Sequence, residues 1–448
     1  MNMTTLNHAY FGTSGGKSPF VLVLNNGASI TAEDEAMLQA LYSRSPASVL
    51  DHLKKLAEVG SGKFMSSFYV GYGHKSIGDC GDTTIFIEGV SMLAAKAVQD
   101  WALYNGQEVS TRYVDFSQQP FYSTGLEQQT QQELFRDFYV SSMQEVKDSL
   151  KARYPKRDNE DEEKYNKAIN ARAFDILRGF LPAGALTSLA WHTNLRQAAD
   201  KLDWLRVHPL AEVRDVADLI DKALKQAHPH SFGHKRYDAS DAYRESYMEH
   251  DYYFRLDKEL SEVTLSRDAL DRETLFEYQT CIDSRPKYTE LPKQLAEAGY
   301  LQFEFSLDFA SFRDLQRQRA VSQRMPLLTT SHGFHSWYLE ELPHSVREKA
   351  SYLIDKFESW YRAQDSLETV LQYAVPMGYK VPCRVTGDLP ALVYVVELRS
   401  SSTVHATLRR VAQSMGNIIS SLGVLVHIDN SDSGRFDVKR GGQDIVQK

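Results

Sequence analysis

Residues 301–326 read LQFEFSLDFASFRDLQRQRAVSQRMP and join an apolar-rich segment to a basic one. "LQFEFSLDF" predicts a β-strand, and "ASFRDLQRQRAVSQ" predicts a helix that follows it directly. The last ten residues hold three arginines and a serine, whereas the chain as a whole carries a net charge of −8. Arginines near a helix end are often solvated or interact with the helix dipole. The alternative is that they form a local anion site.

The first half of the chain shows the same order of elements. "TTIFIEGVS" predicts a strand and "SMLAAKAVQDWALY" a helix, and the stretch "NGQEVSTRY" (105–113) follows. Further on, Pro182 precedes Asn194 by twelve residues, and an arginine closes the next apolar stretch, "WLR". Pro376 precedes Asp388 by the same distance, and "ELR" follows. The sequence therefore predicts an old duplication, with one copy in residues 1–235 and the other in 236–448.

Other segments are predicted from local patterns. "PFVLVLNNG" predicts a strand, and residues 29–56 predict one helix that starts with a capping box of Thr31 and Asp34. Residues 125–175 are predicted to be helical and heavily charged. The segment around Pro182 is predicted as helix, break and further helix, and "VPMGYKVP" as a second break.

Composition limits the class of protein. A chain of 448 residues exceeds the size of one core, so two domains or a duplicated unit are expected. The negative net charge argues against binding nucleic acid or an anionic membrane surface. Three widely spaced cysteines without CxxC spacing predict neither disulfides nor a metal site. With no signal-peptide pattern and no long apolar run, we expect a soluble, cytoplasmic protein.

These motifs resemble those of ThyX, the flavin-dependent thymidylate synthase family. The family signature reads Arg-His-Arg, two residues, Ser, one residue, Asn-Glu, one residue, Ser, one residue, Arg. The first half keeps its end as "QEVSTRY", but Asp100-Trp101-Ala102 replaces the Arg-His-Arg triplet. It also keeps "GHKS", "RGFLP", "NLR" and "WLR" in the family order.

The second half departs from the family in the opposite way. "RQRAVS" keeps the beginning of the signature, with Gln318 in place of histidine, and Asp314 lies where the family often has Gln or Glu. Leu327 and Thr329 then replace the Ser-x-Arg residues. The counterpart of Arg178 is Gln372. Each half has thus lost what the other kept.

The resemblance implies an α+β fold with two tandem ThyX-like units, each a mixed β-sheet with packed helices. It also implies one composite nucleotide site, since family sites combine residues of different subunits. The implied roles are substrate binding by Ser110, Arg112, Glu108, Arg178, Asp314, Arg317 and Ser322, catalysis by Arg206 and Arg399, and cofactor binding by His74, Ser76, Asn194, Arg196, Gln318 and Arg319.

The implied activity is reductive C5-methylation of dUMP to dTMP. FAD would be the cofactor, methylenetetrahydrofolate the carbon donor and NADPH the reductant, and two chains would replace the family tetramer. Arginine suits a nucleotide phosphate because its guanidinium group binds such anions bidentately. Two alternatives stay open at this point. One is a nucleotide-binding or scaffolding protein without flavin chemistry, and the other is methylation of a different pyrimidine nucleotide.

Overall fold

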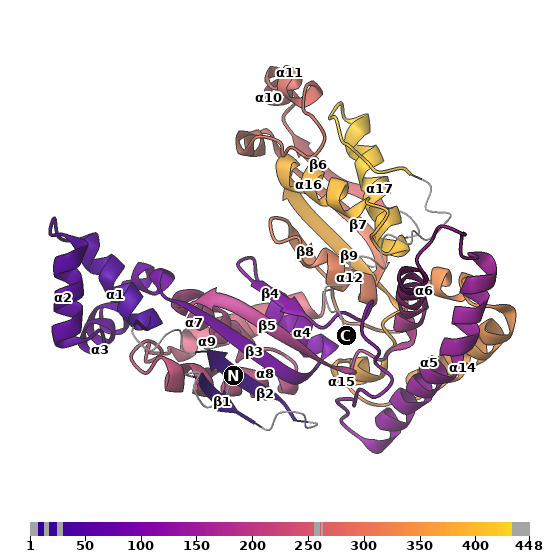
Figure 1. Ribbon diagram of the computed structural model, residues 1–448, viewed down its shortest axis with the longest axis horizontal. Helices are drawn as coiled ribbons and strands as arrows, with labels where there is room; N and C mark the ends of the chain where they lie inside the picture. The colour runs from indigo at the N-terminus through magenta and orange to yellow at the C-terminus, as the bar shows by residue number, and fades with distance from the viewer. Residues whose placement is uncertain (1–7, 13–17, 25–29, 255–259, 261–262, 432–448) are drawn as a thin grey trace. The chain divides into compact units, whose positions relative to one another are not determined.

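The computed structural model describes residues 8–12, 18–24, 30–254, 260 and 263–431, and the chain divides into two compact units (Figure 1). Unit 1 comprises Met1–Val109, Pro120–Tyr122 and Ala185–His250. Unit 2 comprises Ser110–Gln119, Ser123–Gly184 and Asp251–Lys448. Part of the first half of the sequence therefore belongs to the same compact unit as the second half. The repeat boundary between residues 235 and 236 stays a prediction.

Unit 1 is built on a five-stranded sheet with the order β1-β2-β3-β5-β4. Its strands are β1 (His8–Phe11), β2 (Phe20–Leu24), β3 (Asp82–Ser91), β4 (Asn105–Glu108) and β5 (Leu186–Asn194). Its helical segments are α1 (Ala32–Tyr42), α2 (Val49–Val59), α3 (Gly62–Phe64), η2 (Met65–Gly71), η3 (Lys75–Cys80), α4 (Met92–Gln99), α7 (Leu195–Leu205), α8 (Ala211–Ala227) and most of α9 (Asp238–Tyr252).

Unit 2 is built on a four-stranded sheet with the order β6-β7-β9-β8. Its strands are β6 (Thr264–Leu270), β7 (Gly299–Asp308), β8 (Ser322–Arg324) and β9 (Lys380–Asp388). Its helical segments are α5 (Leu126–Arg153), α6 (Glu162–Leu177), η4 (Arg178–Phe180), α10 (Arg272–Glu277), α11 (Gln279–Asp283), η5 (Lys293–Ala298), α12 (Phe309–Leu315), α13 (Ser336–Glu340), α14 (His344–Arg362), α15 (Glu368–Leu371), η6 (Gln372–Ala374), α16 (Leu389–Arg399) and α17 (Ala406–Ser421).

The two sheets share one topology, and the α+β class is confirmed. Strands β3 and β7 begin 217 residues apart, and so do β4 and β8. The prediction of a mixed sheet in each unit was wrong, because every described strand pair is antiparallel. The reason is that β3 and β4, joined through α4, run parallel to each other but are separated by β5. Strand β9 separates β7 from β8 in the same way.

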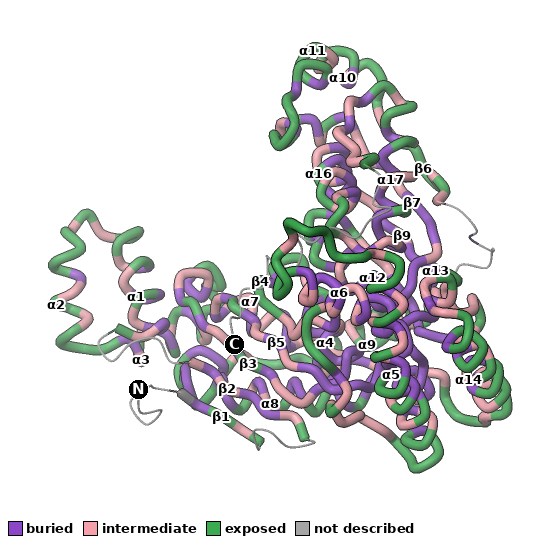
Figure 2. Tube along the Cα trace, turned by 45° about the vertical axis from the view of Figure 1, so that its right-hand side comes forward, coloured by how far each residue is buried: buried purple, intermediate pink, exposed green. Residues whose placement is uncertain are grey.

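The core of unit 2 lies where helices cover the central strands. Phe303 and Phe305 of β7 are at most 1% exposed, and Val381, Cys383 and Val385 of β9 are fully buried. Helices α12, α16 and α17 pack on β7, and the buried stretches stand out in Figure 2. Each large apolar side chain buried this way stabilises the fold by about 1.5–3 kcal/mol. The packing fixes the ends of α12 and α16, where the basic residues lie.

The two halves of the sequence meet in unit 2 around a bridge between Pro182 and Pro376. Shifting one half by 194 residues maps each hydrogen bond of this contact onto another. The Ala183 N–H donates to the Val375 carbonyl at 2.9 Å, and its equivalent is the Met377 N–H, which donates to the Leu181 carbonyl at 2.9 Å. The Gly184 N–H donates to the Tyr373 carbonyl at 2.8 Å, and its equivalent is the Gly378 N–H, which donates to the Gly179 carbonyl at 2.7 Å. The contact is self-complementary, as between two subunits related by a two-fold axis.

Several predicted elements need correction. The helix expected over residues 29–56 is two helices, α1 and α2, with Pro46 in the connection, although the capping box of Thr31 and Asp34 is confirmed. The helix expected to reach residue 323 ends at Leu315, and β8 follows. The segments after both proline breaks are the central strands β5 and β9 instead of helix or irregular chain. Both strands are flanked on two sides, so their apolar runs resemble those of buried helices.

Candidate functional site

Unit 2 brings together charged residues from both halves of the sequence. Arg112, Asp175 and Arg178 come from the first half, and Asp314 and Arg399 from the second. Their side chains are buried or partly buried, and together they form what we call the arginine cluster, with Arg317 as its sixth member. All members except Asp175 belong to the set that the family resemblance divides between two subunits.

Arg112 follows β4 and is held by a bidentate ion pair. Its Nε lies 2.7 Å from Asp175 Oδ1, and its Nη2 donates to Asp175 Oδ2 at 3.1 Å and to the Thr403 carbonyl at 3.2 Å. Ser110 turns the chain before it by accepting from the Arg112 N–H at 3.2 Å. Burial alone would lower the pKa of Arg112, but Asp175 raises it. The guanidinium group is therefore fixed in both charge and orientation.

Arg178 lies at the start of η4 and is 1% exposed. Its Nη2 donates to Ser311 Oγ of α12 at 3.0 Å, and its Nη1 lies 3.6 Å from Asp314 Oδ2. Its Nε has no hydrogen-bond partner among the described residues. A guanidinium group so deeply buried needs a counter-charge, and Asp314 on α12 supplies it.

A buried polar network supports Arg178 from behind. Ser311 Oγ also lies 3.1 Å from His405 Nδ1 and 2.8 Å from Thr407 Oγ1, while His405 Nε2 lies 3.3 Å from the Asp175 carbonyl. Burial, reinforced by Arg178, holds the pKa of His405 well below its usual range. The neutral ring then donates from Nε2 and accepts at Nδ1. The network links the residues that hold Arg112 and Arg178.

Asp314 is the electrostatic centre of the cluster. Burial would raise its pKa, but Arg178, Arg112, Arg317 and Arg399 together lower it to about 2. Arg399 is the last residue of α16, and burial lowers its pKa although Asp314 acts in the opposite direction. With the Gln318 amide oxygen turned toward it, Arg399 donates to that oxygen from Nε at 3.1 Å and Nη2 at 2.7 Å.

The charges of the arginine cluster do not cancel. Four arginines and the two carboxylates of Asp175 and Asp314 leave a net charge of +2. Arg317 is exposed and makes no hydrogen bond or ion pair with another described residue, so its charge faces solvent. Arg319 and Ser322, which are close to Arg317 in the sequence, are also exposed. Ser322 is the first residue of β8, and Arg319 lies three residues before it. The cluster can therefore bind an anion at its Arg317 edge.

The remaining predicted residues lie in unit 1. His74 and Ser76 are exposed at η3, and Asn194 caps α7 by accepting from the Gln197 N–H at 2.9 Å. Glu108 accepts from Gln99 Nε2 at 2.8 Å.

The two predicted arginines of unit 1 are offset by carboxylates. Arg196 pairs with Asp79 at 2.7 Å and Asp200 at 3.5 Å. Arg206, the counterpart of Arg399, lies 3.1 Å from Asp203 and 2.7 Å from Asp221.

The position equivalent to Arg178 in the second half has a different chemistry. Gln372 is 1% exposed, and its Oε1 accepts from the Leu328 N–H at 3.0 Å. Its Nε2 donates to Tyr252 Oη at 2.6 Å and to the Thr369 carbonyl at 3.1 Å. Thr329, at the lost arginine position, is buried and lies beside Ser331 Oγ. No cationic group replaces the lost arginines at these two positions.

Sequence reasoning missed Asp175 and the network of Ser311, His405 and Thr407. Asp175 lies three residues before Arg178, one helical turn away, which was the available signal for a paired carboxylate. The histidine gave no signal because its partners Ser311 and Asp175 are more than ninety positions away in the sequence.

Comparisons with known proteins agree with this picture. Residues 29–230 match the family described as Thymidylate synthase complementing protein. Over these residues the chain is similar to the ThyX family. A UPF0159 protein of Chlamydia muridarum is 26% identical over 410 residues, which cover 77% of this chain and 76% of that relative. A UPF0159 protein of Thermoplasma acidophilum is 25% identical and covers 91% of this chain and 99% of its own length.

A solved structure was also compared. The crystal structure of Thymidylate Synthase X from Helicobacter pylori with FAD and dUMP has 18% sequence identity and a TM-score of 0.29. The match covers 47% of this chain and 96% of that one.

The residues that ThyX likeness assigns to FAD differ in how well they fit it. A flavin dinucleotide needs cations for its pyrophosphate and aromatic or polar neighbours for its ring. In unit 1, Arg196 is offset by two carboxylates, but Tyr72 and His74 offer stacked rings 6.2 Å apart. In unit 2, the arginine cluster has surplus positive charge. The residues of unit 2 therefore fit the phosphates of a flavin dinucleotide, whereas those of unit 1 offer aromatic rings without surplus positive charge.

Two further searches cover only the described part of the chain. There, no helix is both long and apolar enough to cross a membrane, and no group of three or more His, Cys, Asp or Glu side chains is arranged to hold a metal ion.

Proposed function

We propose that this chain is a flavin-dependent thymidylate synthase-like enzyme that methylates dUMP at C5. Methylenetetrahydrofolate would donate the carbon and NADPH the reducing equivalents. The observation that carries the proposal is the net charge of +2 in the arginine cluster of unit 2. A nucleotide monophosphate carries roughly two negative charges near neutral pH, as a phosphorylated side chain does. The cluster and the phosphate are therefore matched in charge.

The phosphate would bind at the exposed edge of the cluster. Arg317 faces solvent, and Arg112 is 12% exposed, so both can reach an anion without unfolding. Arg178, which is buried and held by Ser311 and Asp314, would attract the phosphate through its positive charge without contacting solvent. Because Asp175 and Asp314 fix two of these guanidinium groups in place beforehand, little reorganisation is needed on binding. Ser110 would add a hydroxyl donor at the same edge.

Arg399 would act on the pyrimidine ring. It lies at the end of α16 with Gln318 on one side, and burial places its charge in a poorly solvated environment. A fixed cation in such a place stabilises negative charge that develops on the ring during methyl transfer. The charge of Arg206 is instead offset by its ion pairs with Asp203 and Asp221. One of the two duplicated arginines would therefore serve in catalysis.

FAD would supply hydride transfer when bound. The residues that the family resemblance assigns to it are Gln318, Arg319, His74, Ser76, Asn194 and Arg196. No side chain of the protein has to act as a nucleophile for this chemistry. Two chains would assemble as a homodimer, each supplying one composite site.

The first experiment is an absorbance spectrum of the purified protein with and without added FAD and dUMP. A flavin band that shifts when dUMP is added supports the proposal, and a turnover assay then follows. Binding of dUMP without any flavin band would instead support a nucleotide-binding protein without flavin chemistry. Gln318 in place of the family histidine and the offset charge of Arg196 favour that second candidate.

A further inference from the structure

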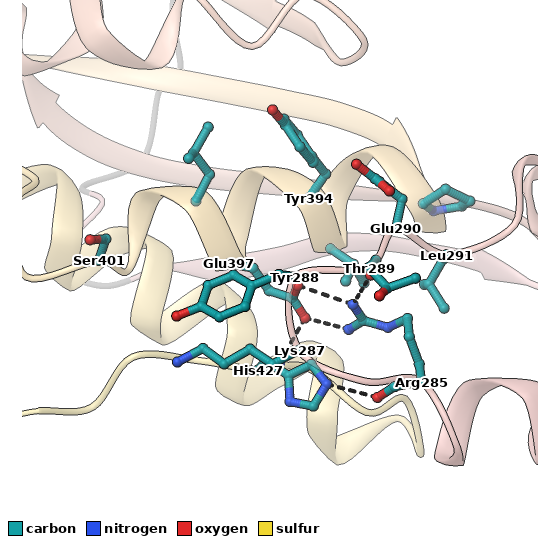
Figure 3. Close-up of a pocket in the computed structure, with 13 residues that line it drawn as sticks. Arg285, Lys287, Tyr288, Thr289, Glu290, Leu291, Tyr394, Glu397, Ser401 and His427 are labelled. Carbon is teal, nitrogen blue, oxygen red and sulfur yellow. Dashed lines mark hydrogen bonds and ion pairs between the residues drawn. The ribbon is translucent and has the colours of Figure 1, made fainter.

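The last turn of α16 carries Arg399, and the helix is anchored just before that residue. The carboxylate of Glu397, two positions earlier, binds both terminal nitrogens of Arg285 and accepts from the His427 N–H at 2.8 Å. His427 Nε2 lies 2.9 Å from the carbonyl of Arg285, whose side chain is buried. Figure 3 shows how these three residues come together from separate segments of unit 2. This network fixes one side of the helix end.

The chain is anchored again directly after Arg399. Ser400 is fully buried, its Oγ accepts from the Asp429 N–H at 3.1 Å, and its carbonyl accepts from Arg409 Nε at 2.7 Å. Arg409 is itself buried and also donates from Nη2 to the Asp429 carbonyl at 3.1 Å. Because the chain is held on both sides, the backbone of Arg399 is fixed and only its side chain keeps rotational freedom.

The side chain of Arg399 is held by Gln318. With the Gln318 amide oxygen turned toward it, Arg399 donates to that oxygen from Nε at 3.1 Å and from Nη2 at 2.7 Å. Gln318 is 7% exposed, its N–H donates to the Leu315 carbonyl at 2.9 Å, and its carbonyl accepts from Gln323 Nε2 at 2.7 Å. The acceptor is therefore as firmly placed as the helix end that it contacts.

The acceptor that holds Arg399 carries no charge. Among the described residues, no carboxylate forms an ion pair with Arg399, and Asp314, which acts on it most strongly, pairs instead with Arg178 at 3.6 Å. Arg206, the counterpart of Arg399 in the first half, is held by two carboxylates. A carboxylate fixes a guanidinium group and offsets its charge, whereas an amide oxygen fixes the group and leaves the charge available.

We infer that Gln318 is a positioning residue: it holds Arg399 in place without offsetting its charge, so that this cation stabilises a pyrimidine ring that becomes negatively charged. The inference rests on the proposed function, because the ring is that of the proposed nucleotide substrate. The family resemblance expects a flavin ligand at position 318, but in this chain the amide oxygen is already engaged by Arg399. A fixed cation in a poorly solvated place is most effective where charge develops during a reaction.

The contact is tested by urea unfolding of the full chain without any ligand. Gln318→Met keeps the length of the side chain and removes the acceptor, so it should raise the equilibrium constant of unfolding about tenfold or more, the size of a hydrogen bond to a charged group. In an Arg399→Met chain the same change should not raise it, because the donor is absent. Gln144→Met, at an exposed glutamine of α5, is the matched control and should change neither chain.

The effect on charge is tested by calorimetric titration with dUMP and with 5-nitro-dUMP, whose ring is an anion at neutral pH. The ratio of the two affinities cancels binding to the phosphate and reports on the ring alone. Relative to dUMP, the anionic ring should lose about tenfold or more in affinity in Gln318→Met, where Arg399 is not held, and in Gln318→Glu, where a carboxylate offsets its charge. A role in folding alone would leave this ratio unchanged.

The outcomes separate this inference from the proposed function. If Gln318→Met has the same effect on unfolding with and without Arg399, the contact is absent and the inference is overturned. If both Gln318 variants keep the wild-type affinity ratio, Gln318 does not position the charge, and the inference is overturned even in a chain that binds dUMP. A chain that shows the dependence on Arg399 but binds neither nucleotide refutes the synthase proposal and keeps Gln318 as the residue that holds Arg399.

Discussion

The charge of Asp314 is the feature of the site whose stabilising effect is best defined by the structure. Its pKa falls from an ordinary 3.8 to about 2 in the folded protein. That difference corresponds to about 2 kcal/mol in favour of the ionised carboxylate. The substitution Asp314→Asn keeps the shape and removes the charge, so it should lower the free energy of unfolding at pH 7 by about this amount.

The sign of the pH dependence follows from the lowered pKa. A carboxylate that ionises more readily in the folded state contributes its full stability above pH 3.8 and loses it as pH falls toward 2. The difference in the free energy of unfolding between wild type and Asp314→Asn should therefore narrow to about 1 kcal/mol at pH 3. Urea unfolding at pH 7, 5 and 3, followed by circular dichroism, measures it.

The control is Asp365→Asn, which removes an exposed carboxylate of the same unit and should change stability little at any of these pH values. The reasoning is refuted if the free energies of unfolding of wild type and Asp314→Asn differ by less than about 0.5 kcal/mol at pH 7, or if their difference does not narrow at pH 3. Either result would show that the arginines do not stabilise the Asp314 carboxylate.

Four further substitutions test other parts of the molecule. Arg317→Ala and Arg112→Ala should each abolish dUMP binding in a titration, but only Arg112→Ala should also cost about 3–5 kcal/mol of stability, because it leaves buried Asp175 unpaired; normal dUMP binding by either refutes the composite site. Gln372→Ala should destabilise by about 1–3 kcal/mol through lost buried hydrogen bonds and leave dUMP affinity unchanged; a large loss of affinity contradicts the assigned pairing. Burial lowers the pKa of His228 to about 4, so about 3 kcal/mol of stability should be lost as pH falls from 7 to 4, and denaturant titrations of His228→Gln should show a flatter dependence; an unchanged slope excludes this histidine as the cause.

Local patterns predicted three interior strands of the sheets. The strands at "PFVLVLNNG", "TTIFIEGVS" and "LQFEFSLDF" are present as β2, β3 and β7, because alternating or β-branched residues are typical of strands flanked by turns. Strands β5 and β9, which are also interior, were missed. Their apolar runs resemble those of buried helices, and they form strands through pairing with neighbours distant in sequence, β3 with β4 and β7 with β8.

The site was predictable only where a motif carried it. Arg112, Arg178, Asp314 and Arg399 came from the family resemblance, and unit 2 brings them together. The residues that hold these side chains in place could not be predicted from the sequence. Ser311 and His405 contact each other only because the fold brings distant segments together. The ion pair of Arg206 with Asp221 could not be predicted either, because the local sequence "WLR" does not indicate whether the arginine has a carboxylate partner.

The self-complementary bridge at Pro182 and Pro376 has a consequence for how such a protein can change over time. In an assembly of identical subunits, one mutation alters every copy of a site at once. In the proposed duplication, two former subunits share a single chain, so a mutation changes one side of the bridge and leaves the other unchanged. Arg178 and Gln372 are the two different residues expected at equivalent positions after such a change. If the proposed composite site alone binds the nucleotide, the equivalent residues of the other pairing are constrained by stability only.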